Sequence, residues 1–250
     1  MIEDVKIVIT KKFSSKNPII VEGFPGIGLV GTISASYLVE KMKMEQVGHV
    51  TSRSFPPLAA VHKYVPMHPA RVYASRDGKY IVILSEFVIP MMKVRNLADV
   101  IYDFALERKA REIISLGGIT IKGEQDTVYA IASTPAIVKK LSSTKGVELI
   151  KEGATTGVAG VLLARGADEN FPVSSLLAEA HAEFMDPKGA AMVIEVLNKM
   201  LGMKIDTTDL ESEANQIQEK MRDIIDKAKI VHERYKETEG KDHSLGPMYG

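Results

Sequence analysis

A glycine-rich segment is the first place in this sequence where a ligand could be held. Gly26, Gly28 and Gly31 have the spacing G-x-G-x-x-G and follow the β-branched run Ile19-Ile20-Val21. In dinucleotide-binding proteins, glycines at this spacing let the backbone approach a pyrophosphate at the start of a helix. The acidic residue expected about 20 positions later is missing, and no Lys precedes Thr32 as a Walker loop requires. Two interpretations remain open: a nucleotide or anion site, and a tight strand-to-helix turn.

Other groups capable of chemistry are scattered along the chain. Glu22 and Glu86 each close a predicted strand and could meet at the carboxyl edge of a sheet, where sites in α/β proteins usually lie. Ser34 and Ser36 lack the G-x-S-x-G context of a hydrolase nucleophile. No two histidines have the i, i+4 spacing of a helical zinc site. We therefore predict no catalytic residue, no metal site, no cofactor and no enzymatic activity. The six histidines are His49, His62, His68, His181, His232 and His243.

The last three residues, Met248-Tyr249-Gly250, have the chemistry of an anchor. Tyr249 stands one residue before the terminal carboxylate, Met248 is apolar, and Pro247 restricts the backbone just before them. A tyrosine ring supplies apolar area and a hydroxyl that needs a partner, and a carboxylate is satisfied by a Lys or by backbone amides. This ending is suited to insertion into a pocket of a partner protein.

The elements that position these groups are those of a layered α/β domain. Val72 to Arg76 and Lys79 to Leu84 flank Asp77-Gly78, which predicts an antiparallel hairpin. Thr134-Pro135 and Asp186-Pro187 have the cap and the first-turn proline of helix starts. Further strands are predicted at Ile19-Ile20-Val21, 113–116 and 127–132, and helices at 30–38, 97–104 and 190–201. Strands that alternate with helices, together with a hairpin, predict an α/β domain with a mixed sheet over residues 1–206.

The C-terminal section differs from this domain. Thr208-Asp209-Leu210-Glu211 is a capping box at a helix start. From Leu210 to Tyr235, apolar residues alternate at spacings of four and three, which predicts an amphipathic helix over residues 207–236. This helix either packs on its own domain or pairs between subunits, and the pattern does not choose. Residues 237–250 contain almost no apolar side chains before the terminal anchor and are predicted to form a flexible tail.

Composition excludes several classes of protein. The chain has 250 residues with 32 basic and 32 acidic side chains, and this balance argues against a broad contact with nucleic acid. No apolar run approaches the roughly 18 residues that span a membrane. Cysteine is absent, so thiolate chemistry and disulfides are excluded, and the cytoplasm is the expected compartment.

Four segments resemble the archaeal proteasome assembly chaperone family, which is sometimes grouped with ATP-grasp proteins. They span roughly residues 15 to 210: Gly23-Phe24-Pro25-Gly26-Ile27-Gly28-Leu29-Val30-Gly31, Gly157-Val158-Ala159-Gly160-Val161-Leu162-Leu163, Asp186-Pro187-Lys188-Gly189-Ala190-Ala191 and Leu201-Gly202-Met203-Lys204-Ile205-Asp206. The resemblance implies a three-layer fold like that of purine nucleoside phosphorylases, a homo-oligomer, and a partner in the proteasome core particle.

The terminus also resembles a known motif. Met248-Tyr249-Gly250 is similar to the hydrophobic-tyrosine-any ending with which chaperones and ATPases enter pockets between proteasome α-subunits. In such an ending the carboxylate of Gly250 would pair with a pocket Lys, and Tyr249 would pack on the pocket wall. Tails in the family vary in length, and not all carry this motif.

The leading hypothesis is therefore a non-enzymatic proteasome assembly chaperone or regulator that binds the α-ring through its tail. The alternative is an enzyme or sensor that binds a nucleoside or nucleotide at Gly26, Gly28 and Gly31. A scaffold that uses the C-terminal helix for a different partner is a third reading. The three hypotheses share one expected fold, which cannot separate them.

Overall fold

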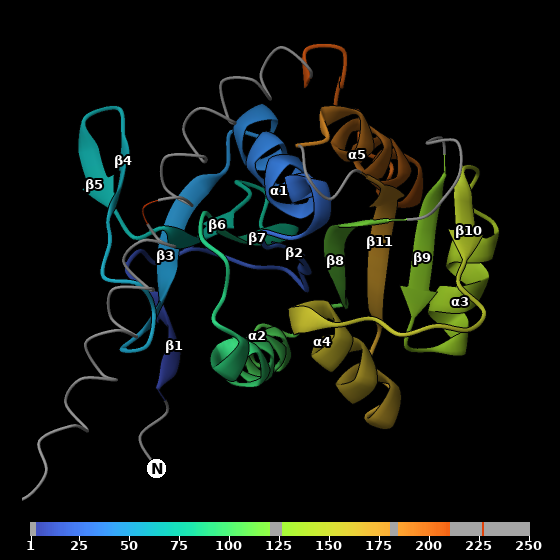
Figure 1. Cartoon of the computed structure of the whole chain (residues 1–250), viewed down its shortest axis with the longest axis horizontal. Helices are drawn as coiled ribbons and strands as arrows, with labels where there is room; N and C mark the ends of the chain where they lie inside the picture. The colour runs from blue at the N-terminus through green and yellow to red at the C-terminus, as the bar shows by residue number, and fades with distance from the viewer. Residues whose placement is uncertain (1–3, 121–126, 181–184, 211–226, 228–250) are drawn as a thin grey trace, which may run out of the picture.

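The computed structural model describes residues 4–120, 127–180, 185–210 and 227. Nine strands form one sheet in the order β1-β3-β6-β7-β2-β8-β11-β9-β10, and β4 pairs only with β5 in a separate hairpin (Figure 1). In chain order the strands are β1 (Val5–Ile9), β2 (Ile19–Gly23), β3 (Glu45–Ser52), β4 (Ala60–His62), β5 (Val65–Met67), β6 (Ala70–Ala74), β7 (Tyr80–Ser85), β8 (Glu112–Ile119), β9 (Val128–Ala132), β10 (Val147–Leu149) and β11 (Val173–Glu179).

The sheet is mixed, with a parallel centre. β7, β2, β8 and β11 run parallel to one another, so their carboxyl ends open at one edge. On one side β6, β3 and β1 continue in antiparallel pairs, and on the other β9 is antiparallel to β11 and parallel to β10. The predicted hairpin at Asp77-Gly78 is confirmed, because it joins β6 to β7 and Gly78 adopts a positive φ of 71° in the turn.

Five α-helices flank the sheet in the described part of the chain. Figure 1 shows α1 and α5 over one face and α2 and α4 over the other, with α3 beside the β10 edge. Their bounds are α1 (Val30–Lys41), α2 (Val94–Glu107), α3 (Pro135–Ser142), α4 (Gly157–Asp168) and α5 (Pro187–Leu201), and short 3-10 turns, η1 (Ile27–Leu29) and η2 (Met91–Lys93), precede α1 and α2. None of these helices, in the ranges described, combines the length and the apolarity needed to cross a membrane.

The two predicted helix starts are confirmed in detail. The hydroxyl of Thr134 accepts a hydrogen bond from the amide of Ile137, and the carboxylate of Asp186 accepts one from the amide of Gly189 at 2.7 Å. Each cap is followed by a proline at the first helical position, where the missing N–H costs nothing.

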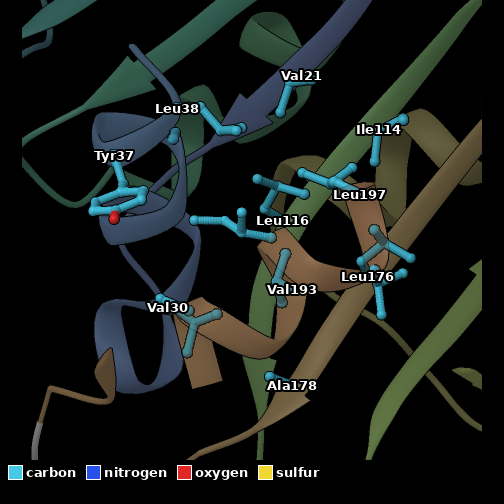
Figure 2. Packing of buried hydrophobic residues seen from close by; sticks show 14 of the residues in the cluster. Val21, Val30, Tyr37, Leu38, Ile114, Leu116, Leu176, Ala178, Val193 and Leu197 are labelled. Carbon is cyan, nitrogen blue, oxygen red and sulfur yellow. The ribbon is translucent and has the colours of Figure 1, made fainter. Parts of the chain in front are cut away.

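A separate apolar core lies on each face of the sheet because side chains alternate along the strands. In β2, Val21 points to the core beneath α1 and α5, and Ile20 points to the core beneath α2 and α4. Figure 2 shows the first core, in which Leu38 of α1 and Leu197 of α5 meet side chains from the central strands. The predicted α/β class with a mixed sheet is thus confirmed, in a layered form.

Residues after α5 are tied back to the domain. The side-chain amide of Asn198 donates to the carbonyl of Ile205 and accepts from its amide, at 2.8 and 3.0 Å. The hydroxyl of Tyr37 donates to the carbonyl of Asp206, and Leu210 is buried in the α1/α5 core. The hydroxyl of Thr208 donates to the Asp206 carboxylate, and the predicted capping contact with Glu211 lies outside the described residues. Most of the predicted helix over 207–236, and all of the tail over 237–250, lies outside the described residues.

Candidate functional site

The glycine-rich turn packs backbone directly against backbone. A Cβ atom on Gly31 would lie 2.2 Å from the carbonyl oxygen of Leu116 in β8. A Cβ atom on Gly23 would lie 2.2 Å from the carbonyl oxygen of Gly31 and 2.6 Å from the Cβ of Ala35. Real side chains do not approach this closely, so glycine at these positions lets the start of α1 rest on the sheet.

The other two glycines of the turn have different surroundings. Gly28 has a φ of +61°, and a Cβ there would meet Ala180 at 2.8 Å. Its carbonyl accepts a hydrogen bond from the amide of Asp186 at the start of α5. Gly26 is extended, with a φ of −152°, and a Cβ there would meet nothing within 4 Å. Because protein atoms occupy the space beside Gly28 and Gly31, the geometry favours the tight-turn interpretation over a phosphate-binding loop.

A cavity of about 810 Å³ lies beside this turn. Its wall includes residues 24–27 of the turn, the segment from Val88 to Val94 that leads into α2, and the end of β8. The opposite wall is formed by residues 148–159, which run from β10 into the first turn of α4. The cavity therefore sits where the parallel strands end, which is the usual place for a ligand site in an α/β sheet.

The floor of the cavity carries a polar row that crosses three strands. Glu22 of β2 faces Ser115 of β8, and Ser115 faces Ser175 of β11, each pair in parallel register. Glu22 and Ser175 line the cavity, and both are buried. The hydroxyl of Ser175 has no hydrogen-bond partner among the described residues. Burial raises the pKa of the Glu22 carboxyl to about 7, although the Ser115 hydroxyl opposes part of that rise.

This carboxyl should make stability fall as pH rises. Its pKa increases from 4.5 to about 7 on folding, so the stabilisation is complete below pH 4.5 and is lost as pH rises through 7. Ionisation of Glu22 lowers the free energy of unfolding by about 3 kcal/mol in total. Replacing Glu22→Gln removes this titration. We expect urea unfolding to show that the variant gains about 2–3 kcal/mol relative to the parent protein between pH 5 and pH 8.

A matched control removes one exposed carboxylate from α2. Glu107→Gln should leave the pH profile of stability parallel to that of the parent protein, because Glu107 is exposed. If Glu22→Gln also gives a parallel profile, the Glu22 carboxyl is not held in its neutral form.

The second predicted carboxylate, Glu86, belongs to a different group of side chains. The guanidinium of Arg71 donates to both of its oxygens, at 2.7 and 2.9 Å, and His62 lies 2.9 Å from one of them. Burial alone would raise the pKa of Glu86, but hydrogen bonds from His62 and Arg71 and their charges lower it overall. Glu22 lines the cavity and Glu86 does not, so the structure does not bring the two carboxylates together as the sequence suggested.

The remaining candidates are placed as follows. His49 stacks on His68 with ring centroids 3.7 Å apart, and burial, followed by the charge of His68, lowers the pKa of His49. Across the part of the chain that the structure describes, no group of three or more His, Asp or Glu residues could hold a metal ion. His181, His232 and His243 lie outside that part, as do Met248, Tyr249 and Gly250, so the predicted anchor stays a prediction.

The cavity was missed by sequence reasoning, although one signal pointed to it. Ser115 and Ser175 are buried polar residues beside the apolar residues of β8 and β11. In a buried strand, such a residue needs a partner or a ligand. The sequence does not show that both serines and Glu22 lie in one row, because this depends on which strands are neighbours.

Together the layered sheet, the packed glycine turn and the cavity define an α/β protein whose candidate site lies at the carboxyl ends of its parallel strands. The sequence profile of the PAC2 family matches residues 20–225, and the chain belongs to that family.

Three relatives share most of their length with this chain. A Methanocaldococcus jannaschii protein, Uncharacterized protein MJ0106, is 31% identical over 249 residues and is covered completely, as is this chain. The crystal structure of Pyrococcus furiosus PbaA, described as an archaeal homolog of proteasome-assembly chaperone, is 32% identical with a TM-score of 0.78, and the match covers 96% of each chain. Pyrococcus furiosus PbaB, described as an archaeal proteasome activator, is 28% identical with a TM-score of 0.74, and the match covers 89% of this chain and 99% of PbaB.

Proposed function

We propose that this protein is a proteasome assembly chaperone or regulator that binds the α-ring of the core particle through Met248-Tyr249-Gly250. The likeness to PbaA carries the proposal, because it extends over 96% of both chains at 32% identity. The likeness to PbaB, a proteasome activator, supports the same partner. The cytoplasm is the compartment that this role requires.

The proposed docking relies on the chemistry of the terminus. The Tyr249 ring supplies the buried area that dominates small contacts, and its hydroxyl and the Gly250 carboxylate supply orientation. A single short peptide binds weakly because it loses conformational freedom on binding. Several tails on one oligomer raise the effective concentration at neighbouring pockets of the α-ring. The proposed mechanism therefore needs more than one copy of this chain.

An exposed apolar surface on the β4–β5 hairpin supports self-association. The hairpin extends away from the sheet (Figure 1). Val61, Tyr64 and Val65 are 64%, 99% and 57% exposed, which is unusual for side chains of this size on one short element. Burying them against a second copy would remove apolar area from water, which is the main source of stability in subunit contacts. We propose a homo-oligomer in which this hairpin takes part.

The tail proposal is tested by binding to a purified archaeal core particle. Tyr249→Ala should weaken binding by about 2 kcal/mol for each tail, roughly thirtyfold, because an aromatic anchor is lost. Deletion of Met248-Tyr249-Gly250 should abolish binding that surface plasmon resonance can detect. Neither change should alter thermal stability of the folded domain.

The matched control is Leu245→Ala, which removes an apolar side chain from the same segment outside the final three residues. It should bind the core particle as the parent protein does. Retention of full binding by both Tyr249→Ala and the deletion variant would overturn docking through the tail.

A further inference from the structure

The cavity beside the glycine turn holds a buried acid that has no basic partner. Glu22 is 3% exposed, and no Lys, Arg or His within the described ranges forms an ion pair with it. Two other buried acids among the described residues form ion pairs, Glu86 with Arg71 and Glu112 with Lys140 at 2.8 Å. Buried Glu179 and Asp186 accept hydrogen bonds instead, from the hydroxyl of Tyr129 and the amide of Gly189. A buried carboxyl is normally paired or kept neutral because an isolated charge is expensive to bury. Of the buried acids without an ion pair in the described ranges, Glu22 is the one that lines the cavity, where a ligand could supply its partner.

The charged groups around the cavity favour a positive ligand. Glu148 and Glu152 line it with Glu22, and Lys151 is the one basic side chain among the described lining residues. Tyr129 lines it as well, and its hydroxyl donates to the carboxylate of Glu179. The second oxygen of that buried carboxylate has no partner among the described residues. Three acidic side chains and one basic side chain thus line the cavity among the described residues, and the field inside attracts cations.

The remaining wall is apolar and suits a hydrocarbon body. Phe24 and Ile27 come from the glycine turn, and Ile131 and Leu177 come from neighbouring strands beside the polar row. Apolar walls with a few convergent polar groups are typical of sites for small organic ligands. The unpartnered hydroxyl of Ser175 adds a hydrogen-bond acceptor to the floor of the cavity, in the same row as Glu22 and separated from it by Ser115.

We propose that this cavity binds a small organic cation, that is, an amidinium, guanidinium or ammonium group on an apolar body. The positively charged group of the ligand would contact Glu22 and Ser175. A planar cation can donate to both oxygens of a carboxylate, which makes such pairs strong and directional. The binding site is separate from the terminal anchor, and the proposal does not rest on docking to the proteasome.

Binding of this kind is coupled to ionisation of Glu22. The pKa of its carboxyl is raised to about 7 by burial, so the carboxylate form becomes predominant only above neutral pH. A cation prefers that form and lowers the pKa when it binds. Affinity should therefore rise roughly tenfold from pH 6 to pH 8, as the ionised fraction grows by about that factor. Four other titratable side chains line the cavity: Glu148, Glu152, Lys151 and Tyr129. Any pH dependence of binding that remains after Glu22 is replaced by Gln comes from these groups.

Three probes of nearly the same shape test the proposal: benzamidine, which is positive, benzamide, which is neutral, and benzoate, which is negative. Ligand-observed NMR titrations with the full chain measure weak binding of such fragments. We expect benzamidine to bind at least tenfold more tightly than either relative at pH 8. We expect its affinity to fall roughly tenfold at pH 6.

Two variants complete the experiment. Glu22→Gln keeps the shape of the side chain, and it should weaken benzamidine binding at least tenfold and remove the pH dependence. Glu107→Gln, which removes an exposed charge on α2, should bind as the parent protein does. The proposal is overturned if benzamidine binds no better than benzamide at pH 8, including the case in which none of the probes binds, or if Glu22→Gln retains full affinity.

Discussion

Gly31→Ala is expected to destabilise the protein by about 3 kcal/mol or more. A Cβ atom at this position would lie 2.2 Å from the carbonyl oxygen of Leu116 and 3.1 Å from that of Phe24. Both obstacles are backbone atoms of the sheet and of the turn, so no side-chain rotation relieves the clash. The helix α1 must move away from β8, which opens the core that both elements bury. Urea unfolding followed by far-ultraviolet circular dichroism measures the loss.

The same turn contains its own control. Gly26 has an extended backbone and open space where a Cβ would lie, so Gly26→Ala should change the free energy of unfolding by less than about 0.5 kcal/mol. The two substitutions are chemically identical and only five residues apart in sequence. Equal stability of the two variants would show that close packing at Gly31 does not hold α1 against β8.

Breaking the buried ion pair of Arg71 and Glu86 has the second large effect. Glu86→Gln should destabilise the protein by about 3–5 kcal/mol at neutral pH, because it leaves the guanidinium of Arg71 buried without its counter-charge. The pKa of Glu86 is lowered in the folded protein, so its stabilisation exists above the unfolded pKa and is lost as pH falls. This dependence has the opposite sign to that of Glu22. Unfolding curves at pH 7 and pH 4 measure it.

A surface pair serves as the comparison. The guanidinium of Arg165 lies 2.8 Å from the carboxylate of Asp103, whose side chain is 55% exposed. Asp103→Asn should cost less than about 1 kcal/mol, because water already satisfies much of both charges. If Glu86→Gln lowers the free energy of unfolding by no more than Asp103→Asn does, burial does not determine how much the Arg71–Glu86 pair stabilises the protein.

Local features of this fold were predictable where a residue type leaves few alternatives. Asp77-Gly78 allows the positive φ of a tight hairpin, and Thr134-Pro135 and Asp186-Pro187 combine a cap with a proline at the first turn. The order of strands was not predictable from these signals. Pairing of β1 with β3, or of β9 with β11, depends on the cooperative packing of distant segments.

The candidate sites likewise combine residues that the sequence could identify with arrangements that it could not. The spacing of Gly26, Gly28 and Gly31 serves a phosphate-binding loop and a packed turn equally well, and only the neighbours of each glycine distinguish them. Glu22 was noted as a strand-end carboxylate, but its row with Ser115 and Ser175 requires the register of three strands. The terminal anchor rests on residue type and position alone, and it stays a prediction that binding must test.

The place of β2 in the sheet has a consequence for how the chain is made. It precedes both of its partner strands in the chain, yet it belongs in the middle of the sheet, where Ile19 faces Tyr80 on one side and Glu112 on the other. Its partners arrive much later, and contacts between such distant segments are slow to form. Until β7 and then β8 emerge, Ile19, Ile20 and Val21 lack their neighbouring strands and expose an apolar strand edge that can aggregate. A protein proposed to guide the assembly of others is thus itself expected to acquire its native structure late and slowly during synthesis.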